Sequence, residues 1–419
     1  MFEKPCLSDY FNSVVSKRLS KVEVSKASNQ HEFNGVGVLR EIFGDVVDGE
    51  RLKLDAEVFY FGKEESCQIK IEGQLTWYNS RWRQPHRSPE YRLYYDSRNI
   101  GPMVVEYARE GDLLLVATGQ SNPLVLIICS QGSVAEHDII SAFNITDHVE
   151  EELEEEFVES RIDATLSHPS LLFLEECLEI KIASQLGEHY LDQLITRFGL
   201  EFPKTSVFSK CARDLFPDEL DVEANPDSAL TSFFDFEFQL FKLMEEHLIW
   251  DRINNTPFEN VGEFLHYSLS VNNRRKSRAG HSLQNHLQFI FCNSNIEFDK
   301  EQKTESNKKP DFMFPKIESY HNPNFPTDGL TMLAVKTTCK DRWRQILDEA
   351  IKIENKHLLT LEEGISVNQT SQMSEANVQL VVPTELHSSY LAKNQQANLI
   401  DLKAFIELVK IRQERYLRN

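Results

Sequence analysis

Two short apolar runs, DFMF at 311–314 and MLAVK at 332–336, constrain the fold of this chain more than any other feature. Short runs of this kind are typical of buried strands. Asp311 opens the first run and Lys336 closes the second. If the two strands are neighbours in one sheet, the carboxylate and the lysine lie together although they are far apart in sequence. A lysine at the end of a buried strand is unfavourable unless it is paired or required for function.

A glutamate in the next segment adds a second acid. The pattern WRQILDEAIKI at 343–353 predicts a helix with Asp341 as its N-cap and with Glu349 on the face of Ile346 and Ile353. Carboxylates can hold a divalent metal, and a lysine beside a phosphodiester can orient water and neutralise growing charge. The same residues also fit a structural ion pair, because a P-D…K…E pattern alone is weakly specific.

The length of 419 residues favours two or three domains. No run of about 18 apolar residues predicts a membrane helix, and the first residues lack the order of a signal peptide. The seven cysteines show no C-x-x-C spacing. We therefore expect a cytoplasmic protein without a membrane, a disulfide framework or a zinc site.

The formal net charge of -21 speaks against a nucleic-acid partner. The acidic residues are concentrated in the middle of the chain, however, between residues 151 and 260, whereas the segment from Arg274 to Arg344 is basic. DNA binding depends on the local field where the duplex lies. The total charge therefore does not exclude DNA.

The N-terminal part of the chain predicts strands. Short β-branched or aromatic runs, punctuated by Gly, Asn, Ser and Pro, occur at 57–61, 67–73, 91–95, 112–117 and 124–129. This spacing predicts a small mostly-β barrel or sandwich over 1–147. The acidic run HVEEELEEEFVE at 148–159 and the helical spacing of 171–198 predict a linker region over 148–197.

The remaining segment, 198–419, has an α/β pattern. QLVVP at 379–383 predicts one more buried strand. Helical spacing occurs at 233–249, 282–291 and 400–411. This α/β domain would contain both apolar runs with the charged ends.

Two basic segments supply candidate DNA contacts. RRKSRAG at 274–280 carries Arg274, Arg275, Lys276 and Arg278, which favours contact with DNA phosphates or bases over a solvated basic turn. The segment 77–98 interleaves aromatic residues with Arg81, Arg83, Arg87, Arg92 and Arg98. Arginine forks beside aromatic rings suit phosphate and guanine contacts, although a solvated basic surface is the alternative for both segments.

Several long blocks resemble the catalytic half of the EcoRII-type restriction endonucleases, which belong to the PD-(D/E)xK nuclease superfamily. The blocks are SVNNRRKSRAG (270–280), NKKPDFMFP (307–315), LAVKTTCKDRWRQILDEA (333–350), HLLTLEEGIS (357–366) and LVVP (380–383). The resemblance runs from about Phe234 to Pro383. It implies a restriction-endonuclease-like α/β fold for the C-terminal domain.

The resemblance also implies roles for single residues. Asp311, Lys336 and Glu349 match the catalytic set, with Asp311 and Glu349 as ligands of Mg2+. Tyr320 matches a tyrosine near the family's active site, with a packed aromatic as the alternative. A triplet that reads C·G pairs in sites of the form CC-x-GG is matched by Lys340, Asp341 and Arg342.

This chain departs from the family pattern at one point. Gln284 and Gln288 stand in a helix where family members often carry an acid. A glutamine lacks the charge that a metal prefers, but its carbonyl oxygen can still be a ligand.

The segment SNQHEFNGVGVLREIFG at 28–44 and the strand at 112–117 carry a fainter likeness. They resemble the N-terminal effector-DNA domain of the same enzymes, a pseudobarrel similar to plant transcription-factor DNA-binding domains. The likeness implies that a loop around His31 and Asn34 binds a DNA duplex together with the arginine-rich hairpin.

These features together imply a Mg2+-dependent type II restriction endonuclease of the kind that binds two copies of its site. A palindromic double-stranded DNA target favours a homodimer. A repair nuclease that recognises damage is one alternative, and the KDR triplet argues against it. The other is a non-cutting DNA-binding regulator on a nuclease fold, which Gln284 favours and the intact catalytic set opposes.

Overall fold

The structure, a computed structural model, contains two compact units. One runs from Lys4 to Ile180 and the other from Lys181 onward. This boundary lies inside the predicted linker region, and residues 148–156 of its acidic run are outside the described residues. The described residues are 4–25, 31–47, 49–64, 67–84, 86–119, 123–145, 157–182, 184–390 and 393–417.

The N-terminal unit is built on an eight-stranded sheet with the order β2-β5-β4-β3-β7-β6-β1-β8. All neighbours are antiparallel except β3 and β7. The strands are β1 (Phe11–Arg18), β2 (Glu32–Phe33), β3 (Leu52–Phe61), β4 (Gln68–Asn79), β5 (Tyr91–Tyr95), β6 (Leu113–Gly119), β7 (Leu124–Cys129) and β8 (Val158–Glu159). The five predicted runs all fall on these strands, so the mostly-β prediction is confirmed.

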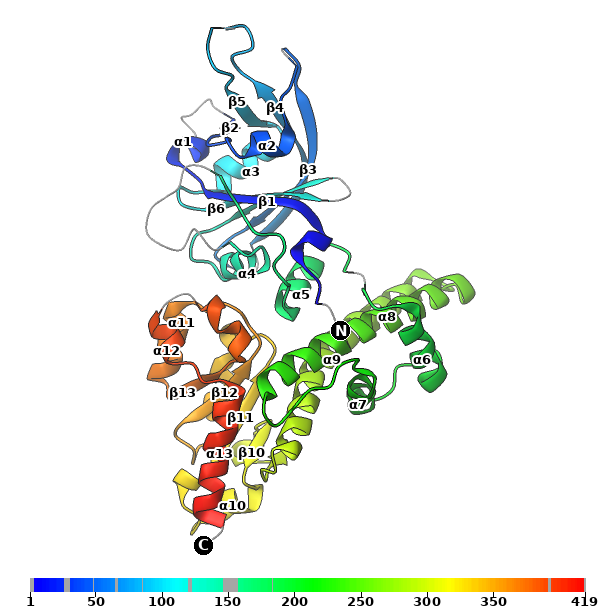
Figure 1. Cartoon of the computed structure of the whole chain (residues 1–419), viewed down its shortest axis with the longest axis vertical. Coiled ribbons are helices and arrows are strands. Elements are labelled where there is room, and N and C mark those ends of the chain that lie inside the picture. Colours follow the sequence, from blue (N-terminus) through cyan, green and yellow to red (C-terminus); the bar gives the residue numbers. More distant parts are fainter. Residues whose placement is uncertain are drawn as a thin grey trace. The chain divides into compact units, whose positions relative to one another are not determined.

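Short helices accompany this sheet, and α2 and α3 lie inside its curve (Figure 1). Ile100 and Val104 of α3 are fully buried in the same core as Val58 and Leu126 of the sheet. The ladder has free edges at β2 and β8 among the described residues, so the pseudobarrel stays a prediction. The helices are η1 (Leu7–Asp9), α1 (Lys21–Val24), α2 (Leu39–Phe43), α3 (Ile100–Tyr107), α4 (Val134–Ala142) and α5 (His168–Glu176).

The C-terminal unit contains a five-stranded mixed sheet with the order β13-β12-β11-β10-β9. The β10–β11 pair is antiparallel, whereas β11, β12 and β13 are parallel. The strands are β9 (Asp299–Lys300), β10 (Phe312–Phe314), β11 (Thr331–Lys336), β12 (Lys356–Thr360) and β13 (Val378–Val381). The α/β prediction for this part of the chain is confirmed.

Helices cover both faces of this sheet. Leu333 of β11 packs with Leu287 and Phe405 on one face, and its neighbour Met332 packs with Trp343 on the other. The alternation follows from the period of two along a strand. The α-helices are α6 (Glu188–Phe198), α7 (Thr205–Leu215), α8 (Pro226–Asn255), α9 (Val261–Asn293), α10 (Ile317–His321), α11 (Val367–Glu375), α12 (Lys393–Ala397) and α13 (Leu402–Leu417). The 3-10 helices are η2 (Glu305–Asn307), η3 (Thr327–Gly329), η4 (Lys340–Asp348) and η5 (Thr384–Ser389).

Two expectations about helices were wrong. The single helix expected over 171–198 is instead α5 and α6, because Glu179 adopts a left-handed φ of 56° and Gly187 caps a new start. The alternative of a solvated basic turn at 274–280 is also wrong, because this segment is the middle of α9, where its Arg, Lys and Ala residues favour a helix that packs along α8. None of the described helices combines the length and the apolarity that a membrane span needs.

Candidate active site and DNA-binding residues

The two predicted strands are neighbours in the sheet. They place Asp311 against Val335, the residue that precedes Lys336. Phe312 of β10 pairs with Leu333 of β11, and Asp311 Oδ2 accepts a hydrogen bond from the Val335 N–H at 2.7 Å. Lys336 ends β11, and its side chain has no hydrogen-bond or ion-pair partner among the described residues. An unpaired lysine next to a fixed carboxylate is available to a substrate phosphate.

Glu349 lies in the same neighbourhood but on a different local structure from the one predicted. The helix expected over 343–353 is the 3-10 helix η4, which ends at Asp348, and its N-cap is Cys339 rather than Asp341. Glu349 follows in an extended conformation. Burial and then the negative charge of Asp311 raise its pKa to about 7, while the charge of Lys336 opposes this rise. The two acids and the lysine therefore act on one another electrostatically.

Gln284 completes the surroundings of Asp311. Gln284 is a residue of α9, and its Nε2 donates to Asp311 Oδ1 at 2.6 Å. Burial nevertheless raises the pKa of Asp311 above its ordinary value. The carbonyl oxygen of Gln284 is buried and has no hydrogen-bond partner among the described residues. A buried oxygen without a partner is unfavourable, so this atom is suited to a ligand that the site would bind.

The donor set fits a hard divalent cation. Asp311 and Glu349 offer carboxylate oxygens, and Gln284 offers the unpartnered carbonyl oxygen. Such oxygen ligands are the ones that Mg2+ prefers. No group of three His, Cys, Asp or Glu side chains able to hold a metal occurs in the described part of the chain.

Sequence reasoning missed two residues of this neighbourhood. Lys300 of β9 is half-buried, and burial lowers its pKa while the charges of Glu301 and Asp311 act in the opposite direction. The Glu301 N–H donates to the Asp311 carbonyl at 3.1 Å. A strand of only two residues has no periodic pattern, so no sequence signal could have placed Lys300 beside Asp311.

Tyr320 is a buried residue of α10, with 1% of its surface exposed. Its hydroxyl donates to the Glu305 carboxylate at 2.6 Å and accepts from the Lys352 N–H at 3.3 Å. Burial and then this hydrogen bond to Glu305 raise its pKa far above the ordinary value. Tyr320 therefore ties η2 to the segment after Glu349, which is a packing role beside the site.

The predicted base-reading triplet begins η4, directly after the turn that follows Lys336. Arg342 is exposed, and its guanidinium donates to the carbonyl and the hydroxyl of Thr338 at 3.0 and 2.9 Å. The side chains of Lys340 and Asp341 lie outside the described part of the structure.

The arginines of α9 divide into different environments. Arg278 is 9% exposed, packs over the rings of Phe202 and Phe208, and donates to the Pro203 carbonyl. Burial lowers its pKa to about 10. The DNA contact expected of Arg278 is therefore replaced by a packing role, because the long helix turns this residue into the core.

The other basic residues of α9 are less buried. Arg275 donates to the buried Glu245 carboxylate at 2.8 Å, and Arg274 lies over the Phe202 ring at 5.0 Å. The side chain of Lys276 is outside the described residues. Arg274 keeps its guanidinium without an ion-pair partner in the described part of the chain, so it stays a candidate for phosphate contact.

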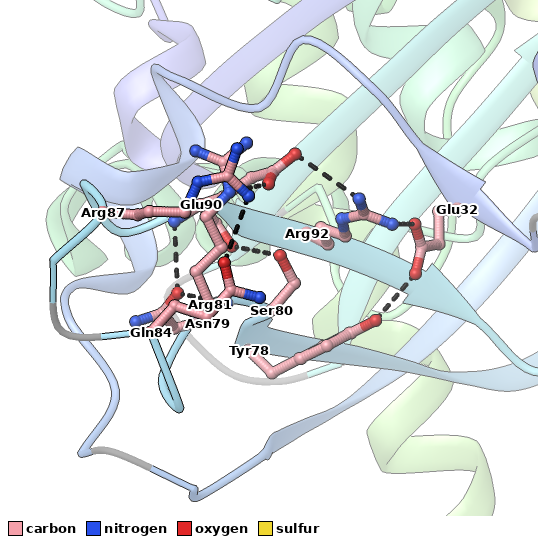
Figure 2. Close-up of polar contacts among 9 residues, drawn as sticks. All are labelled: Glu32, Tyr78, Asn79, Ser80, Arg81, Gln84, Arg87, Glu90 and Arg92. Carbon is pink, nitrogen blue, oxygen red and sulfur yellow. Dashed lines mark hydrogen bonds and ion pairs between the residues drawn. The ribbon is translucent and has the colours of Figure 1, made fainter.

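In the N-terminal unit, two arginines of the predicted hairpin form ion pairs with acidic residues. Figure 2 shows Arg81 beside Glu90, with Nε at 2.5 Å from Oε2, and Arg92 between Glu90 and Glu32. Glu32 also accepts from the Tyr78 hydroxyl at 2.7 Å. These ion pairs fix the ends of β4 and β5 and the loop that joins them.

The loop arginines are different. The Arg87 guanidinium donates to the Gln84 amide oxygen at 3.1 Å, and Arg83 lies 4.5 Å from the ring of its neighbour Trp82, which is 39% exposed. Neither arginine has a carboxylate partner among the described residues. Arg83 and Arg87 are thus the members of this set whose charges are open to a phosphate backbone.

His31 and Asn34 lie on the chain around β2. The His31 ring stands edge-on to Tyr95 at 5.6 Å, and its Nδ1 is buried without a partner. Asn34 is exposed, and its backbone is anchored by the buried ion pair of Lys17 and Glu23. The side chain of Asn34 is therefore presented on a fixed backbone.

Comparison with known proteins connects the C-terminal unit to one family. Residues 241–406 match the family model described as EcoRII C terminal. Over 209 residues the chain is 46% identical to the type II restriction enzyme EcoRII of Escherichia coli, with 49% of this chain and 50% of that protein covered. It is 26% identical over 182 residues to the type II restriction enzyme SsoII of Shigella sonnei, with 38% of this chain and 57% of that protein covered.

The chain thus spans about half the length of the curated relatives it matches. Among solved structures, metal-depleted Ecl18kI in complex with uncleaved DNA aligns with a TM-score of 0.43 and 18% identity over 55% of this chain and 86% of that chain. The complex of restriction endonuclease PspGI with substrate DNA aligns with a TM-score of 0.40 and 12% identity over 54% and 93%. The family match and the identity to EcoRII confirm the resemblance stated for this part of the chain.

Proposed function

From the match of residues 241–406 to the EcoRII C-terminal family model, we propose that this protein is a type II restriction endonuclease that hydrolyses double-stranded DNA at a specific site. The observation that carries the proposal is the placement of Asp311 one residue from the unpaired Lys336, with Gln284 and Glu349 around them. A fixed acid beside a lysine suits phosphodiester hydrolysis, because the acid can hold a metal and the lysine can stabilise charge on the phosphate.

In the proposed reaction, Lys336 stands beside the scissile phosphate. Its ammonium group orients the attacking water and stabilises the negative charge that develops on the phosphate oxygens. Asp311 is held in place by the Val335 N–H and the Gln284 amide, so its position does not depend on the substrate. Mg2+, held by Asp311, Glu349 and the Gln284 carbonyl, would supply Lewis-acid activation when bound.

We further propose that the triplet of Lys340, Asp341 and Arg342 reads the C·G pairs of a CC-x-GG site. Two cations that flank one acid match guanine acceptors and a cytosine amino group. The triplet begins four residues after Lys336 in the sequence. Base reading and hydrolysis are thereby carried by one continuous segment, which is the feature that supports a site-specific nuclease over a repair nuclease.

For the N-terminal unit we propose the binding of an effector copy of the site, as in type IIE enzymes. The exposed loop arginines Arg83 and Arg87 and the anchored Asn34 support a DNA-binding role for this sheet. A two-fold DNA site further favours a homodimer, which sedimentation of the full chain would reveal from its mass.

The test is cleavage of plasmid DNA by the full chain. A supercoiled plasmid with CC-x-GG sites and one without them are incubated with the protein and Mg2+, and the ends of the products are sequenced. Cuts confined to CC-x-GG positions, and their loss in Lys336→Ala, are the expected result. Cuts at unrelated or damaged positions would favour a repair nuclease.

A second candidate function is a non-cutting DNA-binding regulator, and Gln284 is the observation that favours it. Site-specific binding by the wild-type chain without cleavage in Mg2+ or Mn2+ would support that function and contradict the nuclease.

A further inference from the structure

One buried acid holds the turn between the proposed catalytic lysine and the proposed base-reading triplet. The Cys339 N–H donates to the Glu362 carboxylate, and Glu362 is only 6% exposed. Cys339 is the N-cap of η4, and its own side chain makes no capping hydrogen bond. Glu362, two residues after the end of β12, therefore supplies the acceptor that this helix start lacks. Negative charge at a helix N-terminus is also electrostatically favourable.

The acid is itself fixed by its surroundings. Its N–H donates to Thr360 Oγ1 at 3.0 Å, and the fully buried Tyr390 hydroxyl donates to its carbonyl at 2.8 Å. Thr360 pairs with Lys336 across the parallel β11–β12 ladder, and its hydroxyl donates to the Thr337 carbonyl at 3.4 Å. The end of β12 thus holds both ends of the turn from Thr337 to Cys339.

The turn also fixes the position of Arg342 in the triplet. The Arg342 N–H donates to the Cys339 carbonyl at 2.8 Å, and the Arg342 guanidinium is bonded to Thr338. A shift of Cys339 would therefore move Arg342 relative to Lys336, because both contacts lie within the same turn.

We propose that Glu362 is a positioning residue that couples base reading to phosphodiester hydrolysis, an inference that rests on the proposed nuclease function. Glu362 acts through Cys339 and contacts neither the scissile phosphate nor the metal ligands in this role. Its carboxylate sets the distance and the orientation between the η4 triplet and the end of β11. Removal of the acceptor releases η4 and separates recognition from catalysis.

The test compares Glu362→Ala with Glu362→Gln in the full chain. The glutamine keeps an oxygen that accepts the Cys339 N–H, whereas the alanine does not. We expect Glu362→Ala to lower affinity for a CC-x-GG duplex, measured by fluorescence anisotropy with Ca2+, by roughly ten-fold while affinity for a random duplex changes less than about two-fold. We also expect kcat at saturating DNA to fall more than KM rises, and Glu362→Gln to restore both quantities to within a few-fold of wild type.

Glu375→Ala is the control, because it removes the same charge at an exposed position of α11 in the same unit. Thr360→Val is a second, milder variant that loosens the Thr337 end of the same turn, and it should shift discrimination in the same direction. Equal losses on cognate and random duplexes in Glu362→Ala, or a glutamine variant as impaired as the alanine one, would make Glu362 a purely structural acid. Absence of site preference in the wild-type chain would instead mean that the proposed function, and this inference with it, is wrong.

Discussion

At the scale of single residues, Gln284 most distinguishes this site. Its amide nitrogen occupies one oxygen of Asp311, and its own oxygen is buried without a partner. An acid at this position would add negative charge beside two carboxylates whose pKa values burial already raises. The amide therefore stabilises the metal-free site, whereas an acid would stabilise the metal-bound one.

We predict that Gln284→Glu lowers the thermal midpoint in EDTA. Added Mg2+ should raise the thermal midpoint of this variant by more than it raises that of wild type. Ligand binding to the folded state adds stability as RT ln(1 + [L]/Kd), so a tighter site shows a larger shift at the same Mg2+ concentration. Thermal unfolding over a Mg2+ series measures this. Gln288→Glu, on the exposed side of α9, is the control and should show no such gain. Parallel Mg2+ responses in all three proteins would remove Gln284 from the metal site.

Lys336→Ala should lower the rate of cleavage by at least about 100-fold, because a group beside the scissile phosphate chiefly stabilises the transition state. Binding to the CC-x-GG duplex in Ca2+ should remain close to that of wild type. Glu349→Ala should also stop cleavage, and excess Mg2+ should restore part of it because the lost interaction is with the metal. Wild-type rates in either variant would contradict the site assignment.

The burial of His357 leads to a separate prediction about how the free energy of unfolding depends on pH. This β12 residue is 3% exposed, and burial followed by the charge of Arg412 lowers its pKa to about 4. Below pH ~6.5 the unfolded chain binds a proton that the folded chain refuses, so stability falls as pH decreases from about 6.5 to about 4. The contribution is on the order of 1 kcal/mol per pH unit in that window.

Urea unfolding between pH 7 and pH 4.5 measures this dependence. His357→Leu should flatten the loss of unfolding free energy in that range, although its stability at pH 7 can differ from that of wild type. His281→Ala, at an exposed position of α9, should leave the slope unchanged. An unaltered slope in His357→Leu would show that His357 does not take up a proton on unfolding.

At the scale of elements, the hairpin of β4 and β5 carries two kinds of arginine: some pair with acidic residues of the fold, and others are open to a ligand. Arg81 and Arg92 are neutralised by Glu90 and Glu32, whereas the loop arginines have no carboxylate partner in the described part of the chain. An arginine that already pairs with an acid gains less from a phosphate, since binding would first break that pair.

We therefore predict that Arg83→Ala and Arg87→Ala each reduce the salt dependence of duplex binding by the N-terminal unit. Each lost phosphate contact should lower the slope of log K against log[salt] by about 0.9. Arg92→Ala should instead lower the thermal midpoint and leave the slope nearly unchanged, because Arg92 links β5 to β2 through Glu32. Anisotropy titrations of a fragment ending at Ile180 at several salt concentrations measure the slope, and thermal unfolding of the same fragment measures the midpoint. A larger slope change in Arg92→Ala than in Arg83→Ala would show that Arg92, rather than Arg83, contacts the phosphates.

At the scale of the whole molecule, the two compact units allow separate functions to be tested. The site residues all lie in the unit that begins at Lys181, and the arginine hairpin lies in the other. A unit with its own sheet and core is expected to fold without the rest of the chain.

We predict that a fragment from Lys181 to Asn419 cleaves DNA, and that added site-containing oligonucleotide stimulates the full chain but not this fragment. The substrate is a plasmid with one CC-x-GG site, and an oligonucleotide without the site is the control. If the N-terminal unit holds an effector copy, its removal abolishes the stimulation. Identical stimulation of both proteins would make the N-terminal unit an ordinary DNA-tethering module.

The sequence by itself determined the strands and the residues at their ends. Local β propensity and apolar runs placed β5, β7, β10 and β11, and the blocks around Asp311 and Lys336 carried the family resemblance. These signals are local, because they depend on side chains only a few positions apart. Neighbouring strands then explain why Asp311 and Lys336 meet.

Only the tertiary structure decided which charges remain available. Arg278 is turned into a phenylalanine core, Arg92 is paired with Glu32, and Gln284 reaches Asp311. Cys339 likewise donates to Glu362, which follows β12 and lies well beyond the turn in the sequence. Each contact joins residues far apart in the chain, and periodicity carries no information about such partners. The energy of a buried charge depends on those partners rather than on its sequence neighbours.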